Sequence, residues 1–550
     1  MKITVMALTA LLFTMCAAPP SVCTAWYAAN PDADTFEIST AADLAGLARL
    51  VNVDGIGFNG KTIALIRDIN LSKYDSTFND GKGWIPIGGS GGIHGDNIKN
   101  TFQGVFDGNG KVVRGLFIND TVSPRHFGLF GAVTGGTVKN LGVTGVDIRV
   151  KGGYAGAVVG HVIGPTMQNP DVDSGRVINC HAAGTVRSKG IGAGGVAGLV
   201  MIGTIRDSRF SGTVSTAGDA GGVAGIVYYG NMANCYSDAA VTGLSKIGGV
   251  AGSLHNGNVT NSYSTGAVGG ATVVVDGVSY VTGMYVGGVV GYVTYGGVTN
   301  SYSTGAVTGY DIVGGVVGGI LHSLSDTVNI SGSAVNNCYS TGAVSGVGLF
   351  VDGVHEDGGS YVGGVVGNVE IAVNGPIKSN TVVANSYAAG AVSGHDYVGG
   401  VIGGIRYSLM LFGGQRVDIS EHTVDTSAFV SNSAALNPSV TWSGNNGGRV
   451  VGHINIDIDR RGGSRGNAAT ENTARDGHPR LAGLAAFGGM TITGIDSGGI
   501  GANTKNGASL TMAEIRADGT IGGRFTSKSG WTTQNGRLPG LFGNTVDMFQ

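Results

Sequence analysis

Valine, glycine and polar residues follow one fixed order along the middle of the chain. The order is Gly-Gly-Val-x-Gly, then Val-x-Asn-Ser/Cys-Tyr-Ser-x-Gly-x-Val, and it is clearest from Gly287 to Gly309. Successive Gly-Gly pairs are spaced by 27, 27, 39, 27, 49 and 36 residues. The second glycines of these pairs are Gly195, Gly222, Gly249, Gly288, Gly315, Gly364 and Gly400. A period of this size is typical of stacked repeats, and the longer spacings indicate insertions into a 27-residue unit.

The unit has room for three strands of about five residues, separated by Gly or Asn turns. Stacking such units in parallel predicts an all-β fold, the parallel β-helix, with about ten to twelve coils. Its valines would fill the interior, and its glycines would supply the positive φ that tight corners need. We expect the right-handed form because parallel crossovers are overwhelmingly right-handed.

An amphipathic helix is predicted over residues 38–51, before the repeats. Thr40 and Asp43 have the spacing of a capping box, and leucine and valine recur on one face of the segment. The first coil of a solenoid has an open edge that must be covered, so we expect this helix to cap it. Residues 26–125 are therefore assigned to an N-terminal cap and the first coils.

Residues 126–440 hold the repeats, and residues 441–550 hold degenerate coils and a C-terminal cap, with a polar, Arg-rich insertion at 454–478. Insertions into the repeats fall at two points of the coil. Residues 271–284 and 348–360 come before a Gly-Gly pair, whereas residues 321–334 and 369–381 come after one. Loops on a rigid scaffold often carry binding, so these insertions are candidate binding elements.

Residues 1–25 are typical of an export signal. Lys2 is followed by an apolar run and then by small residues, and we expect cleavage after Ala25. A lipid anchor at Cys16 or Cys23 is the alternative. No later segment offers about 20 apolar residues without glycine, so we expect no transmembrane segment. The exported protein would therefore lie at the cell surface or outside the cell, including association with an outer membrane.

The composition agrees with a packed, exported solenoid. The chain has 103 glycines, 42% hydrophobic residues and only 13% charged residues. A net charge of −3 gives no reason to expect nucleic acid or an anionic membrane as a partner. The expected partners are a surface glycan or a protein ligand.

Three cysteines occupy one slot of the repeat. Cys180, Cys235 and Cys338 each follow an asparagine, where other copies have serine. The same slot on adjacent coils recurs about every 4.8 Å, and at least one serine coil separates each pair of cysteines. Separations of about 10 Å exceed the reach of a disulfide, so we expect these residues to be small fillers of a column.

These motifs resemble the GLUG repeats of exported bacterial proteins and of some immunoglobulin-A-cleaving metallopeptidases, here without the peptidase domain. The resemblance rests on the Gly-Gly-Val-x-Gly units with Asn-Ser-Tyr-Ser-Thr-Gly-Ala-Val, and it extends to segments 38–52, 106–110, 448–452 and 531–541. It implies a parallel β-helix at the cell surface and assigns no catalytic residues to the repeat.

Candidate catalytic groups are few. A zincin needs His-Glu-x-x-His on a helix, but His355-Glu356 lies in a Gly-rich stretch with Gly at position 359. A polysaccharide lyase or hydrolase of β-helix type needs clustered charges on one face. The charged turn residues before Gly-Gly pairs are Asp219, Lys246, Asp311, Asp357 and Asp396, spread over many coils. We therefore expect no enzyme, no cofactor and no metal.

One aromatic column is a candidate binding stripe. The position after the Ser/Cys slot is assigned to His181 and Phe210 and then to five tyrosines, Tyr236, Tyr263, Tyr302, Tyr339 and Tyr387. Alternation from Val298 to Tyr302 favours an interior ladder, but the Asn turn between them could reset the parity. An exposed stripe would suit sugar rings or a partner protein.

The sequence thus predicts a non-enzymatic surface protein whose β-helix displays inserted loops for adhesion or host interaction. A carbohydrate-active β-helix enzyme and a structural stalk are the alternatives.

Overall fold

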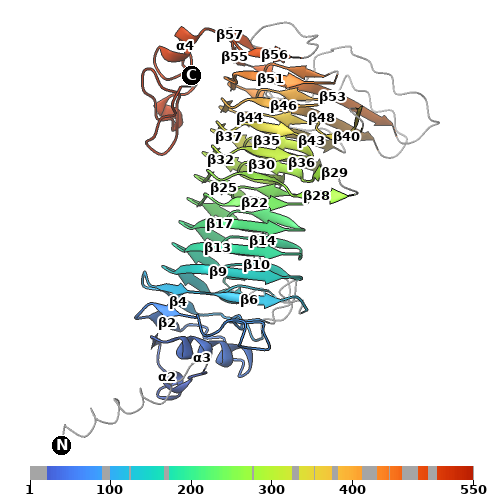
Figure 1. Ribbon diagram of the computed structural model, residues 1–550. Helices are drawn as coiled ribbons and strands as arrows, with labels where there is room; N and C mark the ends of the chain where they lie inside the picture. Colours follow the sequence, from blue (N-terminus) through green and yellow to red (C-terminus); the bar gives the residue numbers. More distant parts are fainter. Residues whose placement is uncertain are drawn as a thin grey trace, which may run out of the picture. The chain divides into compact units, whose positions relative to one another are not determined.

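Short parallel strands stacked in four sheets dominate the chain (Figure 1). The computed structural model describes residues 21–89, 99–122, 126–165, 173–275, 278–324, 334–351, 354–373, 382–411, 430–444, 446–460, 481–482, 484–493 and 504–548. The chain divides into two units, the first comprising Met1–Val241 with Val250–Gly252 and the second comprising Thr242–Gly249 with Ser253–Gln550. The predicted parallel β-helix is confirmed, whereas its hand and the predicted domain limits stay predictions.

The described part of the first unit contains α2 (Ala25–Ala28) and α3 (Ala41–Asn52), which lie on either side of β1 in the chain. Thr40 Oγ1 accepts the Asp43 amide at 3.1 Å, and Asp43 Oδ2 accepts the Thr40 amide at 3.0 Å, so the predicted capping box is present. A side chain at Gly46 would lie 1.8 Å from the carbonyl oxygen of Cys23, which packs against α3 and is buried. Cleavage after Ala25 would remove this contact, and the cleavage site stays a prediction. Cys16 lies outside the described residues.

The strands of the first unit are grouped by sheet. Sheet A holds β1 (Thr35–Ile38), β2 (Thr62–Leu65), β4 (Val105–Asp107), β8 (Thr137–Lys139), β12 (Arg176–Ile178), β16 (Thr204–Arg206) and β20 (Asn231–Ala233). Sheet B holds β3 (Ile69–Asn70), β5 (Val112–Arg114), β6 (Phe117–Asp120), β9 (Gly142–Val150), β13 (His181–Ser188), β17 (Arg209–Thr216) and β21 (Tyr236–Ser237). Sheet C holds β7 (Phe130–Thr134), β11 (Val159–Ile163), β15 (Ala197–Met201) and β19 (Ala224–Tyr228), and sheet D holds β10 (Tyr154–Gly156), β14 (Gly192–Gly194) and β18 (Asp219–Gly221).

The unit boundary falls in β22 (Ala240–Gly243) and β24 (Ala251–His255). In the second unit, sheet A holds β25 (Asn258–Thr260), β32 (Gly297–Thr299), β37 (Val335–Asn336), β44 (Val383–Ala384), β49 (Val430–Ser431) and β54 (Leu481–Ala482). Sheet C holds β31 (Val290–Thr294), β36 (Val317–Leu324), β43 (Val366–Val373), β48 (Ile402–Leu411) and β53 (Val451–Arg460). Sheet D holds β23 (Ile247–Gly248), β30 (Met284–Gly287), β35 (Asp311–Gly314), β42 (Val362–Gly363), β47 (Val398–Gly399) and β52 (Gly447–Gly448).

Sheet B of the second unit has two halves. The first half holds β26 (Tyr263–Ser264), β33 (Tyr302–Ser303), β38 (Tyr339–Ser340), β45 (Tyr387–Ala388), β50 (Ala434–Ala435), β55 (Ala485–Phe487) and β57 (Ala508–Leu510). The second half holds β27 (Val268–Gly270), β34 (Val307–Gly309), β39 (Val344–Gly346), β46 (Val392–Gly394), β51 (Ser439–Trp442) and β56 (Thr491–Thr493). A coil therefore runs through sheets A, B, D and C with four or five strands, and the prediction of three strands per coil is wrong.

The Gly-Gly pair exists because two coils approach each other too closely there for a side chain. A Cβ at Gly315 would lie 2.0 Å from the carbonyl oxygen of Gly364 on the next coil and 2.4 Å from Ser340 Oγ. A Cβ at Gly314 would lie 1.9 Å from the carbonyl oxygen of Val317, within the same bend. The valines around the bend are completely buried, as predicted.

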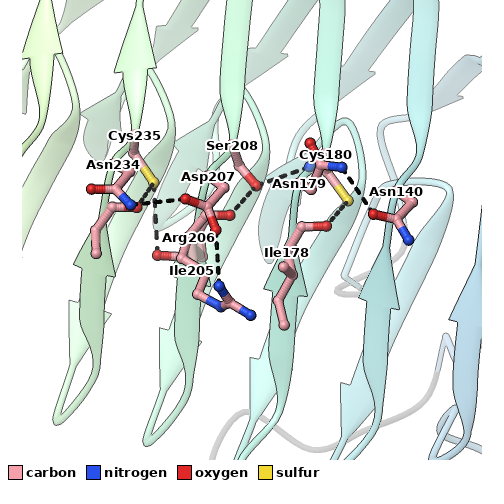
Figure 2. Close-up of polar contacts among 11 residues, drawn as sticks. Asn140, Ile178, Asn179, Cys180, Ile205, Arg206, Asp207, Ser208, Asn234 and Cys235 are labelled. Carbon is pink, nitrogen blue, oxygen red and sulfur yellow. Dashed lines mark hydrogen bonds and ion pairs between the residues drawn. The ribbon is translucent and has the colours of Figure 1, made fainter. Parts of the chain in front are cut away.

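Asparagines at the corner between sheets A and B form a ladder, where the sequence predicts only turns. Asn140, Asn179 and Asn234 have φ of 53°, 50° and 55°, a left-handed conformation that Asn tolerates better than most residues. Asn179 Nδ2 donates to Asn140 Oδ1 at 2.9 Å, and Asn234 Nδ2 donates to Asp207 Oδ1 at 2.8 Å (Figure 2). Each corner is thus hydrogen-bonded to the corner of a neighbouring coil.

The predicted insertion point before the Gly-Gly pair is confirmed, whereas residues 325–333 and 374–381 of the second point lie outside the described residues. Hairpin β28 (Thr272–Val275) with β29 (Val278–Val281) lies between β27 and β30, and hairpin β40 (Leu349–Val351) with β41 (Val354–Asp357) lies between β39 and β42. At the second point, β36, β43, β48 and β53 run on as long parallel strands of 8 to 10 residues. Because β53 continues to Arg460, the insertion predicted at 454–478 begins as a paired strand, and residues 461–478 lie outside the described residues.

Candidate functional site: the tyrosine column and its cover

The five predicted tyrosines all lie on sheet B, each directly after the buried Ser/Cys slot. Ser301 and Ser303 are completely buried, while Tyr302 between them is half-buried. The rings therefore point away from the coil interior. Asn300, at a φ of 50°, reverses the alternation that Val298 begins, so the interior ladder favoured by the sequence alternation is wrong.

Four of the tyrosines form a continuous stack in the second unit. Ring centres are 4.7 Å apart for Tyr263 and Tyr302, 4.7 Å for Tyr302 and Tyr339, and 5.2 Å for Tyr339 and Tyr387. The ring planes are within 8° of parallel in all three pairs. Coil spacing of about 4.8 Å enforces this geometry, since identical side chains occupy successive strands.

Tyr236 belongs to the first unit and has a different neighbour. Arg209 Nη1 donates to the Tyr236 hydroxyl at 2.6 Å, and the guanidinium lies 5.7 Å from the ring centre. Arg209 pairs in register with both His181 and Tyr236, so it fills the column position on its coil. The assignment of Phe210 to the column is wrong, because Phe210 lies one residue later and points into the core.

The C-terminal segment covers one end of the stack. After β57 the chain forms α4 (Met512–Arg516) and the short 3-10 helix η1 (Ser527–Ser529), and this red segment lies beside the upper coils in Figure 1. The Trp531 ring centre is 6.0 Å from that of Tyr339 and 5.7 Å from that of Tyr387. The Tyr387 hydroxyl donates to the Pro539 carbonyl at 2.6 Å.

The cover divides the column into a buried and an accessible part. Tyr339 and Tyr387 are 3% and 0% exposed, within an apolar cluster that includes Phe525, Trp531 and Leu538. Phe542 reaches Tyr302 with ring centres 5.9 Å apart, yet it is itself exposed. Tyr236, Tyr263 and Tyr302 stay half-buried and can touch a ligand at their edges. A binding role of the column stays a prediction.

Burial also fixes the chemistry of the phenols. Loss of solvent raises the pKa of Tyr302 to about 12 and that of Tyr387 well above its ordinary value. These hydroxyls are neutral at physiological pH, so the tyrosine stack of the second unit offers flat apolar faces and hydrogen-bond donors, whereas the column position on the Arg209 coil carries a positive charge.

Comparison with known proteins agrees with this geometry. The family model of the GLUG motif matches residues 282–308, which run from just before β30 through Tyr302 to β34. The chain carries the GLUG repeat. The matched residues contain one Gly-Gly bend, one Asn corner and one ring of the tyrosine column.

Two proteins are similar over part of their length. A protein of Evansella cellulosilytica, provisionally named a Gly-rich membrane protein, is 38% identical over 131 residues, which are 23% of this chain and 14% of that relative. The match thus spans about a seventh of the relative's length. A crystal structure of a Bacteroides ovatus protein, provisionally named an immunoglobulin A1 protease, has a TM-score of 0.34 and 20% identity, covering 59% of this chain and 80% of that one.

The cysteine slot of the GLUG repeat is structural. Cys180, Cys235 and Cys338 are free thiols with at most 1% exposure, and each thiol contacts backbone carbonyls, as Cys180 Sγ does with Ile178 O at 3.4 Å (Figure 2). Serine fills the same place on the neighbouring coil, where Ser208 Oγ donates to the Arg206 carbonyl at 2.9 Å. The predicted column of small fillers is confirmed.

We predict that these thiols resist modification in the folded protein. Burial raises the pKa of all three to about 12, and the thiolate is the reactive form. Iodoacetamide at about pH 8 should label none of them in buffer and all three in guanidinium chloride, as measured by mass spectrometry. Labelling of the native protein at the denatured rate would contradict this.

Two of the charged turn residues have a structural role. Asp311 Oδ1 accepts the Ser360 amide at 2.8 Å, and Asp396 Oδ1 accepts the Asn446 amide at 3.1 Å, so both carboxylates fix turns between coils. His355 and Glu356 lie on strand β41, not on the helix that a zincin needs. Among the described residues no group of three His, Cys, Asp or Glu could hold a metal, and no helix is long and apolar enough to cross a membrane.

Sequence reasoning missed a second set of tyrosines on sheets C and D. Tyr285, Tyr361 and Tyr397 precede Gly-Gly pairs and have φ of 62°, 56° and 56°. Their signal in the sequence is an aromatic residue directly before Val-Gly-Gly, which the periodicity of glycine and valine does not weigh.

Proposed function

We propose that this protein is an exported surface protein whose β-helix is a non-enzymatic scaffold for adhesion or partner binding through its inserted segments. The observation that carries the proposal is that both described hairpins leave the coil at the same position. Strands β27, β34 and β39 pair in register, and hairpins β28–β29 and β40–β41 both leave the coil directly after that position. Two insertions at one corner of a rigid stack favour a common binding edge.

Surface location is supported by the Gly-rich membrane protein name of the Evansella relative and by the expected export signal. The non-enzymatic role is supported by the structural use of Asp311 and Asp396, whose carboxylates are engaged by turn amides. A carbohydrate-active enzyme or a plain stalk would make different predictions for the experiment below.

We predict that shortening the hairpins abolishes binding but leaves the coils folded. The coil between β34 and β35 supplies the template, because a single residue, Tyr310, connects them. Each hairpin is replaced by that one-residue connection. Wild type and variants are compared on a glycan array and on immobilised extracellular-matrix proteins, with circular dichroism as the control for folding.

Other outcomes are decisive against the proposal. Binding that persists without both hairpins would contradict the role of the inserted segments. Release of reducing ends from a polysaccharide, lost in Asp311→Asn, would favour the enzyme. Resistance of the protein on intact cells to added protease would contradict surface display.

A further inference from the structure

The outer face of sheet C in the second unit carries a row of aromatic rings with one amide at its centre. Tyr292, Gly319, Asn368, Gly404 and His453 pair in register across five strands. The places of the two glycines are occupied by rings from elsewhere. A Cβ at Gly319 would lie 2.6 Å from Tyr285 Cδ1, and a Cβ at Gly404 would lie 2.6 Å from Tyr361 Cδ1.

The tyrosines that fill these places are held in an unfavourable backbone conformation. Tyr285 and Tyr361 have φ of 62° and 56°, a region that bulky residues rarely adopt. Such strain persists where the surrounding structure imposes it, and it concentrates at functional sites. Here it turns each ring from the bend onto the face of sheet C. Tyr285 and Tyr292 consequently lie with ring centres 4.7 Å apart.

Asn368 is the polar centre of the row. It is only 8% exposed, and its Oδ1 has no hydrogen-bond partner. A buried amide oxygen without a partner is costly, so native structures rarely leave one without a reason. It lines a small hollow together with Tyr285, Tyr292 and Glu370. The hollow has a volume of about 20 Å³, which is room for about one water molecule or one hydroxyl group.

Two charged groups lie beside the aromatic rings, one of them at the hollow. Glu370 is half-buried at its edge, and the Lys246 ammonium lies 5.1 Å from the ring centre of Tyr292. Tyr292 itself is neutral, because burial raises its pKa to about 12. The site therefore combines flat apolar faces with an amide, a carboxylate and an ammonium group.

We propose that Tyr285, Tyr292, Tyr361, Asn368 and Glu370 form a binding site for a neutral carbohydrate chain that runs along the stack of coils. Pyranose rings present apolar C–H faces, which suit aromatic rings, and hydroxyls that both donate and accept hydrogen bonds, which suit an amide beside a carboxylate. One hydroxyl fills the hollow and satisfies Asn368. Charges of both signs surround the rings, since Glu370 pairs in register with Arg406 and Lys246 lies near Tyr292, so the site favours neither an anionic nor a cationic ligand.

The spacing of the row agrees with an extended chain of sugars. Gly319 and Gly404 lie two coils apart, which corresponds to about 10 Å. The rings of Tyr285 and Tyr361 can thus contact successive parts of one oligosaccharide, with Asn368 between them. The inference builds on the binding role proposed above, but it places the contact on the coils and needs neither hairpin.

The test is titration of the full exported chain with cellohexaose, xylohexaose and chitohexaose, followed by tyrosine fluorescence and calorimetry. At least one hexasaccharide should bind, and Asn368→Leu and Tyr361→Ala should each weaken it about tenfold or more. Tyr229→Ala is the matched control, since Tyr229 is exposed and has a φ of 50° but lies in the first unit. Its affinity should equal that of wild type.

The variant without both hairpins should bind the hexasaccharide like wild type, which separates this site from the proposed loop function. Glu370→Gln, a change at a half-buried edge, replaces Asn368→Leu if the latter does not fold by circular dichroism. Absence of binding at about millimolar hexasaccharide would overturn the proposal. Equal affinity of wild type and variants, or preference for an extended neutral peptide over all three sugars, would overturn it as well.

Discussion

Replacement of Gly315 by alanine is expected to destabilise the second unit by about 3 kcal/mol or more. The new Cβ would lie 2.0 Å from the Gly364 carbonyl oxygen, which is backbone and belongs to the next coil. The Gly315 amide also donates to the Gly363 carbonyl at 3.1 Å, so any shift that relieves the clash lengthens a hydrogen bond between coils. The two coils would therefore have to move apart to accommodate the new methyl group.

Two positions of this chain show when the second glycine of the Gly-Gly pair can be replaced by a residue with a side chain. Arg449 directly follows β52, the last strand of sheet D in the described part of the chain, and is aligned with Gly400, which follows β47. Its guanidinium donates to the Ala486 carbonyl at 3.2 Å. Ala157 is aligned with Gly195, but its backbone is placed differently. The Ala157 amide donates to the carbonyl of Gly195, the second glycine of the pair on the next coil, whereas the Gly315 amide donates to the first glycine of its neighbouring pair. A side chain at this position is thus accommodated only where the stack of sheet D ends or where the bend is shifted relative to the next coil.

Hydrogen exchange is the measurement for Gly315→Ala, because solenoids unfold locally as well as globally. Protection should fall at Val316 and Val317, whose amides donate to the next coil. Gly543→Ala is the control within the same unit. No atom lies within 4 Å of its Cβ, so only its φ of 80° matters, at a cost of about 1 kcal/mol. Equal stability of the two variants would contradict the steric explanation of the Gly-Gly pair.

The sequence was sufficient to predict features that repeat locally. Buried valines and close-packed glycines recur with the coil, so periodicity identifies the β-helix and its insertions. The capping box at Thr40 is equally local. The number of strands was wrong because the residues that end at the first glycine of each pair form a short strand of their own, as β35 does, where the sequence predicts a turn.

Contacts between segments far apart in the chain could not be predicted from the repeat pattern. Tyr387 contacts Pro539, 152 residues away, and Asn337 contacts Ser529, 192 residues away. Nothing in the repeat indicates that the last residues return to its side. The backbone strain that turns Tyr285 and Tyr361 onto sheet C is likewise imposed by the stacked bend, so the aromatic row emerges only in three dimensions.

Replacement of Trp531 by alanine should release the C-terminal segment from the tyrosine column. Trp531 is 2% exposed and contacts Tyr339, Tyr387 and Phe525, the last with ring centres 4.9 Å apart. Removing a buried tryptophan costs about 3 to 5 kcal/mol, which is a large share of what one short segment gains by docking. The coils keep their own hydrogen bonds, so we expect loss of the cover and not loss of the β-helix.

Tyrosine ionisation reports the release directly. Burial holds the pKa of Tyr302 at about 12 and those of Tyr339 and Tyr387 higher still, so these phenols stay protonated when exposed tyrosines ionise. Uncovering them lowers their pKa toward the ordinary value of about 10. At about pH 11 the variant should therefore contain more tyrosinate than wild type in ultraviolet absorbance, and limited proteolysis should cut within residues 511–548.

Phe542→Ala is the matched control for the tryptophan. Phe542 contacts Tyr263 and Tyr302 from the same segment but is 44% exposed, so its loss should cost less than about 1 kcal/mol and leave the titration unchanged. If Trp531→Ala titrates like wild type and resists protease, the segment is held by its backbone and corner contacts, such as Asn432 Nδ2 to the Arg524 carbonyl at 3.1 Å. If instead it titrates as expected, the column under the cover is a second aromatic surface that the C-terminal segment keeps from solvent.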